Sequence, residues 1–341
     1  MRAMLLEKTG LLRDNPTPLR LTDSPDPSPA ADELLIRVSA CGICHTELDE
    51  IEGRMPPHLP IILGHQAVGS ILALGEDVTG FSTGDRVGVA WIFSACGLCE
   101  YCRRGDENLC AQFQATGRDV HGGYADLMTV PAAFAHPIPD VFTDAEAAPL
   151  LCAGAIGYRS LRLTGLQDGG NLGLTGFGAS AHLVAKLVRH QFPATRIFVF
   201  ARSSKERDFA LELGAAWVGD TGEQPPEKLD AIIDTTPAWT PVIEALRQLK
   251  PGGRLVINAI RKEEDDKAAL LQLHYPEQLW LEKEVKSVAN VSRYDVREFL
   301  RLAAEAGIRP EIEEYAMEDA NHALLELKEK HIRGAKVLRM C

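Results

Sequence analysis

Hydrophobic and polar residues follow two different patterns along the chain, and the change falls near residue 152. Before it, short strand-like runs are broken by glycine, as in Leu34–Ser39, Val68–Leu74 and Arg86–Ala90. Five prolines between residues 16 and 29 predict an extended or looping entry rather than a helix. We therefore expect a compact, irregular, β-rich domain in the first part of the chain.

After residue 152, short apolar runs alternate with helical patterns. Strands are expected over Asn171–Thr175, Arg196–Phe200, Ala231–Asp234 and Arg254–Asn258, with helices over Ser180–Gln191, Lys205–Leu213 and Pro241–Leu249. This alternation predicts a parallel sheet covered by helices, and so an α/β fold with a β-rich part. Helices near Val296–Ala306 and Glu318–Glu329 then lead to a last strand, Ala335–Leu338.

Length and charge narrow the classes of protein that fit. The 341 residues suit two domains. The net charge is −12 and no basic stripe is present, which argues against a nucleic acid or an anionic membrane as partner. No run approaches the roughly 20 apolar residues of a membrane span, and the first residues do not resemble a signal peptide. We expect a cytoplasmic protein whose eight cysteines are metal ligands or free thiols.

Four cysteines lie within fifteen residues, in the spacing C-x2-C-x2-C-x7-C: Cys96, Cys99, Cys102 and Cys110. Four thiolates packed this closely can close a tetrahedral zinc site, which leaves no position for a substrate. The predicted role is therefore structural. An iron–sulfur cluster is the competing interpretation, and four unrelated thiols are a third.

Three further ligand-type residues stand apart: Cys44 in GICHTELD, His65 in LGHQAVG and Cys152 in LLCAG. Two thiolates and an imidazole leave the fourth position of a zinc ion open, as in catalytic sites. Such a zinc lowers the pKa of an alcohol substrate. The spacing cannot show that the three meet in space, and a lone buried cysteine or histidine is more often a packing residue.

A glycine-rich turn joins a predicted strand to a predicted helix. The pattern G-x-G-x-x-A covers Gly176–Ala181 and includes Gly178, Ala179 and Ser180. Its glycines allow a close approach to a pyrophosphate, and the helix N-terminus offers free N–H groups. The strand–turn–helix context makes this motif a strong prediction of dinucleotide binding, with Ala181 keeping the helix near the strand.

The end of the next strand predicts which dinucleotide binds. An acidic residue there usually holds the ribose 2′-hydroxyl of NAD, but this chain has Ala201, followed by Arg202 and Ser203. Together with Lys205 and Arg207, these residues suit a 2′-phosphate, and we expect a preference for NADP(H). The alternative is that they are solvated charges at a helix start.

In their order along the chain, these motifs resemble the zinc-containing alcohol dehydrogenases of the medium-chain dehydrogenase/reductase family. The resemblance covers essentially the whole chain. It implies a GroES-like catalytic domain, residues 1–152 and 291–341, into which a Rossmann domain, residues 153–290, is inserted. It also implies two zinc ions per chain and a homodimer or homotetramer.

The resemblance assigns roles to individual residues. Cys44, and not Cys41, would be the zinc ligand, beside His65 and Cys152. The other matching positions are Thr46 (proton transfer from the alcohol), His45 (cofactor pyrophosphate), Glu47 (support of the ligands), Arg333 (cofactor phosphates) and Trp91 (wall of the substrate pocket). Two positions depart from the family: Gln66 replaces a common glutamate, and Asp49 replaces a histidine that often continues the proton route.

The predicted function is the interconversion of a small alcohol and its aldehyde or ketone with a nicotinamide cofactor. A zinc-free enone or quinone reductase has the same fold but lacks both cysteine sets, so the sequence argues against it. A polyol or sugar dehydrogenase remains open, and so does a non-catalytic sensor that binds zinc and a dinucleotide. The complete ligand set together with Thr46 argues against the sensor.

Overall fold

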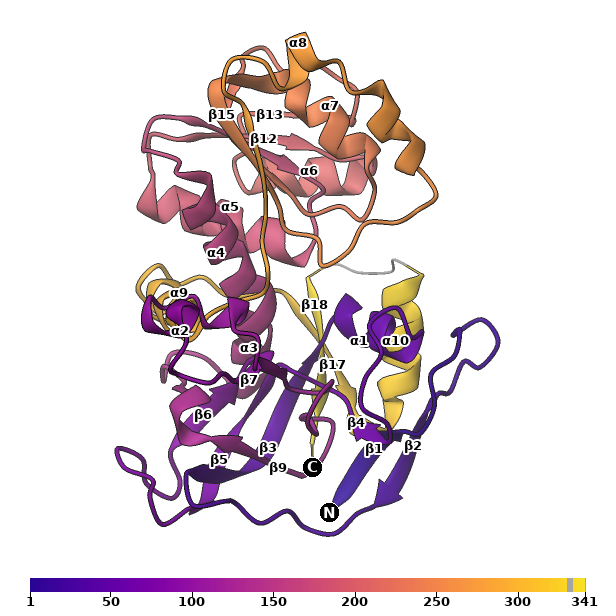
Figure 1. Cartoon of the computed structure of the whole chain (residues 1–341), viewed down its shortest axis with the longest axis vertical. Helices are drawn as coiled ribbons and strands as arrows, with labels where there is room; N and C mark the ends of the chain where they lie inside the picture. The colour runs from indigo at the N-terminus through magenta and orange to yellow at the C-terminus, as the bar shows by residue number, and fades with distance from the viewer. Residues whose placement is uncertain (330–333, 341) are drawn as a thin grey trace. The chain divides into compact units, whose positions relative to one another are not determined.

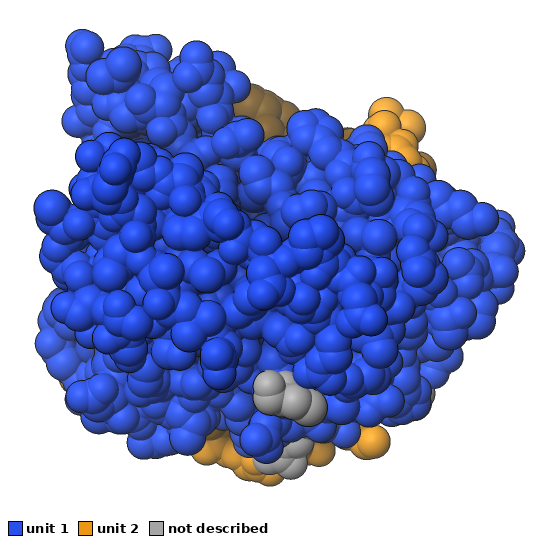
Figure 2. Space-filling model, turned by 90° about the horizontal axis from the view of Figure 1, so that it is seen from below, with its two compact units in different colours: residues 1–155, 290–341 blue, residues 156–289 orange. Residues whose placement is uncertain are grey.

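The computed structural model describes residues 1–329 and 334–340, and the chain divides into two compact units (Figure 2). One consists of residues 1–155 and 290–341, and the other of residues 156–289. The first unit is thus built from both ends of the chain. These bounds lie close to those expected for the catalytic and the cofactor-binding domain. No helix in the described part of the chain is long and apolar enough to cross a membrane.

The main sheet of the first unit is organised around β3 (Glu33–Ile43). Leu34, Ile36 and Val38 are buried while Arg37 is exposed, the alternation expected of a strand with one face on a core. The order of strands is β10 (Ala135–Pro137), β6 (Arg86–Val89), β5 (Ala67–Leu74), β3, β18 (Ala335–Arg339), β17 (Ile312–Ala316), with β9 (Leu127–Pro131) also paired to β3. The C-terminal β18 pairs antiparallel with β3 (Figure 1), so the end of the chain completes the sheet.

Shorter elements surround this sheet. Two small sheets hold β2 (Leu19–Asp23), β1 (Arg2–Leu6) and β4 (Ile61–Ile62), and β7 (Ile92–Ser94) with β8 (Gln114–Ala115). The helices are α1 (His45–Ile51), α2 (Glu100–Arg103), α3 (Asp144–Pro149), α9 (Arg293–Glu305) and α10 (Ala320–Lys328). Short 3₁₀ turns are η1 (Glu107–Leu109), η2 (Ala132–Phe134) and η5 (Met317–Asp319), and η3 (Leu150–Gly154) is a π-helix.

The second unit is a parallel sheet covered by helices. Its strands lie in the order β13 (Trp217–Gly219), β12 (Arg196–Phe200), β11 (Asn171–Thr175), β14 (Leu229–Asp234), β15 (Leu249–Ile257), β16 (Glu284–Ser287). Counted from β11, this is the order 3-2-1-4-5-6 of the doubly wound dinucleotide-binding fold, and the direction of winding reverses between β11 and β14. The helices are α4 (Ala155–Thr164), α5 (Ala179–Gln191), α6 (Ser204–Glu212), α7 (Thr240–Gln248) and α8 (Tyr275–Gln278), with a 3₁₀ turn η4 (Lys267–Gln272).

The expected strands and helices of the second unit are confirmed closely. Strands β11 and β12 have the predicted bounds, and α5 begins one residue before the prediction. A cluster of apolar side chains from the sheet and α7, including Phe198, Ile232 and Leu246, forms the core beneath that helix. The pattern of apolar residues was informative here because the central strands are short, almost fully buried apolar runs, and longer helices with polar residues lie between them.

The pattern missed the helices between residues 45 and 164. Every residue of α1 except His45 is buried although its sequence, HTELDEI, is mostly polar, so the helix has no apolar stripe that would reveal its period. Pro149 lies at the end of α3, and its missing amide hydrogen interrupts the regular helical ladder where the π-helix begins. The candidate ligands Cys44 and Cys152 therefore lie on or next to elements that the sequence pattern does not reveal.

Candidate active site and metal centres

Cys44 stands at the start of α1, in an extended conformation that ends β3. Its amide donates a hydrogen bond of 2.8 Å to Oε2 of Glu47, one turn into the helix. The GICHTELD motif thus ends a strand and begins a buried helix. This arrangement directs the Cys44 thiol and the Glu47 carboxylate toward the same site.

His65 lies between β4 and β5 and is almost fully buried. Its Nδ1 is 2.6 Å from Oε1 of Glu47, which is also buried. Burial opposes protonation of the ring, but the Glu47 carboxylate and the Cys44 sulfur together outweigh it and raise the pKa of His65 well above its usual value. A carboxylate on Nδ1 fixes the ring and leaves Nε2 directed elsewhere, as in histidines that bind metals.

Cys152, on the π-helix η3, completes this group. Its Sγ lies 3.3 Å from Nε2 of His65 and 4.0 Å from Sγ of Cys44. A tetrahedral zinc with bonds of about 2.3 Å to sulfur and 2.0–2.1 Å to nitrogen separates two sulfurs by about 3.8 Å and a sulfur from a nitrogen by about 3.6 Å. The three donor atoms fit one zinc ion, all lying within 4.8 Å of one another. The hydrogen bond between the two thiols also holds the pKa of Cys44 well below its usual value.

The predicted proton-route residues lie on the same helix. The Thr46 hydroxyl is 3.6 Å from Sγ of Cys44, whereas His45 is exposed. Asp49, at the position where the family often has a histidine, accepts a hydrogen bond of 2.7 Å from Nε of Arg54. The departure at this position therefore replaces a titrating ring with a carboxylate held by an ion pair.

Glu50, which no sequence motif indicated, is fully buried on α1. Burial raises the pKa of Glu50 well above its usual value, and the nearby Glu47 carboxylate adds to this effect. The indole N–H of Trp91 lies beside the Glu50 carboxylate, and the Trp91 ring is 5.4 Å from that of Phe113. A buried carboxylate in a motif otherwise explained by metal binding is visible only once the fold is known.

Of the four clustered cysteines, Cys102 lies on α2, Cys99 directly precedes that helix, Cys110 directly follows η1, and Cys96 lies in the chain before α2. Their sulfur atoms lie within 4.8 Å of one another, with Cys96 and Cys102 at 3.9 Å and Cys99 and Cys102 at 3.5 Å. Amide N–H groups of Leu98 and Cys99 point at the Cys96 sulfur, and they lower the pKa of Cys96 to about 6. The spacing fits a single tetrahedral zinc, because an iron–sulfur cluster places several atoms between its cysteine sulfurs.

The glycine-rich turn of the second unit follows β11. Gly176 has a φ of 76°, and a Cβ there would lie 2.8 Å from Oγ1 of Thr235, so the turn requires glycine. Gly178 precedes α5, and a Cβ placed on it meets nothing within 4 Å. Ala181 is fully buried, and the Ser180 hydroxyl accepts a hydrogen bond from the Asn258 side chain. A ligand phosphate therefore has room at this helix N-terminus, beside Ala179.

The residues predicted to select the cofactor follow β12. Ala201 is buried, and its amide donates to the carbonyl of Gly219. Arg202 and Ser203 are exposed, and the guanidinium of Arg207 donates to the carbonyls of Ala201 and Arg202 at 2.6 and 3.0 Å. No acidic side chain occupies this strand end. Arg333, the remaining predicted phosphate ligand, lies outside the described residues.

Comparison with known proteins gives the family. Residues 30–140 match the model of the alcohol dehydrogenase GroES-like domain. Over 94% of its length the chain is 44% identical to a probable alcohol dehydrogenase, AdhA, of Mycobacterium tuberculosis, of which it covers 92%. The chain belongs to the zinc-containing alcohol dehydrogenases of the medium-chain dehydrogenase/reductase family.

Other relatives agree with this assignment. An alcohol dehydrogenase of Geobacillus stearothermophilus is 30% identical over 98% of this chain and 99% of the relative. The solved structure of a cinnamyl alcohol dehydrogenase from Sorghum bicolor is 27% identical, with a TM-score of 0.83 over 98% of this chain and 97% of that one. The protein is therefore an oxidoreductase, and its fold combines a GroES-like and a Rossmann part.

Proposed function

We propose that this alcohol dehydrogenase holds a catalytic zinc on Cys44, His65 and Cys152 and a structural zinc on the four clustered cysteines, and that it prefers NADP(H). The observation that carries the proposal is the convergence of two thiols and one imidazole on a single point, with all donor atoms within 4.8 Å. Three protein ligands leave one of four positions for a substrate, whereas four thiolates leave none.

The chain's own residues have distinct tasks in the alcohol–carbonyl interconversion. When bound, the zinc supplies a Lewis acid that acidifies an alcohol and polarises a carbonyl. Thr46, whose hydroxyl lies 3.6 Å from the Cys44 sulfur, accepts the hydrogen bond of the substrate hydroxyl and carries its proton away. Glu47 keeps the His65 ring in the orientation that presents Nε2 to the metal.

The preference for NADP(H) is supported by charge at the end of β12. Ala201 offers no carboxylate to a ribose 2′-hydroxyl, while Arg202 and Ser203 are exposed there as donors. A guanidinium makes short charge-assisted hydrogen bonds to a phosphate. Arg207 bonds to the strand-end carbonyls and so holds this turn in place.

The experiment measures initial rates of benzaldehyde reduction with NADPH and with NADH. We expect kcat/KM to favour NADPH, and Ala201→Asp to lower this preference by about tenfold or more, which corresponds to about 1.4 kcal/mol. The matched control is Ala194→Asp, which adds the same charge on an exposed residue near the opposite end of β12 and should leave the preference unchanged. A wild-type preference for NADH would overturn the cofactor proposal without touching the zinc site.

The substrate is proposed to be a small alcohol or aldehyde. The Trp91 ring lies 5.4 Å from that of Phe113, in a tilted arrangement, and close to the buried Glu50. This pair of rings supports the proposal of an aromatic wall in the catalytic unit. A panel of primary alcohols, polyols and sugars tests this assignment against the polyol alternative. Higher kcat/KM for sorbitol or a pentose than for benzyl alcohol would move the enzyme to the polyol class. No turnover of any member by zinc-loaded protein would favour the sensor.

We also propose that two or more copies of the chain associate through β16, the last strand of the second sheet, in the cytoplasm. All four residues of β16 are exposed, including Val285 (45%), and two large apolar side chains shortly before it in the chain, Trp280 (55%) and Leu281 (52%), are exposed as well. An uncovered strand edge with apolar neighbours is a site for pairing between chains. Sedimentation of the wild type and of Val285→Lys tests this, and an unchanged mass would oppose it.

A further inference from the structure

The segment that carries Cys152 is held by residues that are not themselves proposed metal ligands. It follows α3, and its place in the fold depends on where that helix begins. The N-terminus of α3 is closed by Thr143, whose hydroxyl accepts the amide of Glu146 at 3.2 Å. This cap satisfies the helix itself but does not attach it to the sheet.

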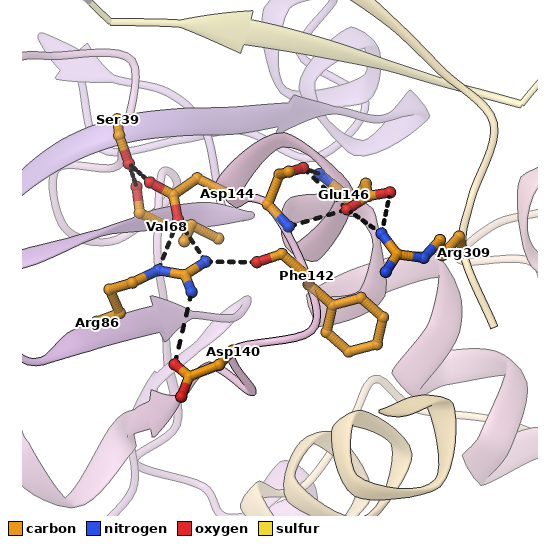
Figure 3. A network of polar contacts seen from close by, with 9 residues as sticks. Ser39, Val68, Arg86, Asp140, Phe142, Asp144, Glu146 and Arg309 are labelled. Atoms are coloured by element: carbon orange, nitrogen blue, oxygen red, sulfur yellow. Dashed lines mark hydrogen bonds and ion pairs between the residues drawn. The ribbon is translucent and has the colours of Figure 1, made fainter. Parts of the chain in front are cut away.

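Asp144, the first residue of α3, makes the attachment to the sheet (Figure 3). Its Oδ1 accepts hydrogen bonds of 2.9 and 2.7 Å from the guanidinium of Arg86 on β6. Its Oδ2 lies 2.5 Å from the hydroxyl of Ser39 on β3, which also lies 3.0 Å from the carbonyl of Val68 on β5. One carboxylate thus joins the start of the helix to β6 and β3, and Ser39 in turn lies against β5.

The same strand, β6, also contacts the ligand segment directly. A Cβ on Gly88 would lie 2.8 Å from both terminal carbons of Leu151, so the Leu151 side chain sits against bare backbone. On the other side, a Cβ on Gly154 would lie 2.0 Å from the ring of Phe299 on α9. Residues 151 and 154 therefore have close packing partners on either side of Cys152, which leaves the backbone there little freedom.

We propose that Asp144, held by Arg86 and Ser39, is a positioning residue that sets the place of the Cys152 sulfur in the catalytic metal site. This inference rests on the proposed role of Cys152 as a ligand. Arg86 fixes where α3 begins, while Gly88, two residues along the same strand, seats Leu151 next to the ligand. Strand β6 thereby determines both the start of α3 and the position of the segment that follows it.

The support of Cys152 matters because a metal site tolerates only small displacements of its ligands. Bond lengths to zinc are tolerated within about 0.2 Å, and groups that orient ligands without touching the metal typically contribute 10–100-fold in affinity. Cys44 and His65 are already oriented by Glu47. Within the described residues, no carboxylate is hydrogen-bonded to Cys152. The position of its sulfur therefore depends on the backbone that carries it.

A second ion pair on the same helix provides a matched control. Arg309 donates to both carboxylate oxygens of Glu146 at 2.6 and 2.7 Å (Figure 3). It also donates to the carbonyl of Val141. This pair joins α3 to the chain beyond α9 rather than to the strands of the sheet. Breaking it with Arg309→Gln removes a comparable interaction from α3 and leaves the attachment of Asp144 intact.

The experiment compares Asp144→Asn and Arg309→Gln with the wild type after cobalt replaces zinc. The cobalt–thiolate absorption of the catalytic site is obtained by subtracting the spectrum of Cys152→Ser, which keeps the four-cysteine site. We expect Asp144→Asn to change this difference spectrum and to speed metal loss to a chelator by about tenfold. Arg309→Gln should match the wild type in both measurements. Ser39→Ala, a milder change, should shift both measurements in the same direction by less.

The outcomes separate two kinds of failure. If Asp144→Asn has the wild-type spectrum and chelator rate, whatever its stability, Asp144 at most stabilises α3 and the inference is wrong. If the wild-type spectrum equals that of Cys152→Ser, Cys152 is not a ligand, and the proposed catalytic site fails together with the inference. A changed spectrum with unaltered affinity for NADPH, whose proposed site lies in the other unit, supports the positioning role.

Discussion

The two groups of proposed metal ligands are built in opposite ways. The four-cysteine group comes from fifteen consecutive residues, with one cysteine on the short helix α2 and the others in the chain next to α2 and η1. The three-residue group spans residues 44 to 152, and each member stands on a different element: the start of α1, the chain before β5 and the π-helix η3. One group is local and the other exists only because the sheet of the first unit brings distant segments together.

This difference decides how each site is supported. Closing a short loop costs little chain entropy, and amide N–H groups of neighbouring residues orient the Cys96 sulfur. The remote site needs buried supports instead: Glu47 orients His65 and holds the amide of Cys44, and the packed α3–η3 segment carries Cys152. We expect loss of the zinc at the four-cysteine site to lower stability with little effect on activity. Loss of the zinc at the three-residue site should abolish activity.

The largest effect is expected for Cys152→Ser. Loss of one of three ligands at an open site should lower kcat by about a thousandfold or more and reduce bound zinc from two ions per chain to one. Elemental analysis and steady-state rates measure this change. The control is Cys41→Ala, which removes a buried thiol near Cys44 that is not a proposed ligand and should keep both zinc ions. Full activity of Cys152→Ser would contradict the assignment of the ligand.

The next effect concerns the local site. Cys99→Ser should release the zinc of the four-cysteine group and lower the free energy of unfolding by about 2–4 kcal/mol, because metal binding contributes directly to folding. The folded fraction should retain kcat within about threefold, since distant sites are usually independent. Denaturant unfolding and rates below the melting temperature measure the two quantities. A loss of kcat as large as that of Cys152→Ser would erase the distinction between the two sites.

The same distinction explains what could be predicted from the sequence. The local cluster was visible as a spacing, and the Rossmann strands were visible because they are short apolar runs that alternate with longer helical patterns. The convergence of Cys44, His65 and Cys152 could be expected only from the resemblance to a family, since no spacing reports a contact between residues 44 and 152. Their meeting in space is a property of the sheet order.

Other features could not be predicted for definite physical reasons. Helix α1 is buried on nearly all sides, so its sequence has no amphipathic period, and Glu50 could not be distinguished from a surface carboxylate. The contact between Asp144 and Arg86 joins residues 58 positions apart. Ion pairs of this kind depend on which strands become neighbours, and single-residue patterns do not contain that information.

A smaller effect on the remote site is expected for Glu47→Gln. The change removes the charge beside Nδ1 of His65 and weakens the hydrogen bond from the Cys44 amide. Zinc affinity of the catalytic site should fall by about 10–100-fold, while the four-cysteine site is unaffected. Competition with a chromogenic chelator resolves the two sites as separate phases. Unchanged affinity in both phases would mean that Glu47 supports only the fold.

The smallest effect concerns the end of helix α1, where Glu52 meets Lys328 of α10 and Arg54. Burial opposes ionisation of Glu52, but these cations and the amide of Leu12 outweigh it and lower its pKa from 4.5 to about 2. A carboxyl with a lowered pKa in the folded state stabilises the protein above its unfolded pKa, and this contribution is lost as the pH falls from 4.5 toward 2. Glu52→Gln should therefore lower stability by about 1 kcal/mol at pH 7, and its difference from the wild type should shrink across that acid range. Urea unfolding at several pH values measures the difference. If the difference in stability between Glu52→Gln and the wild type stays constant down to pH 2, the charge of Glu52 does not stabilise the end of α1.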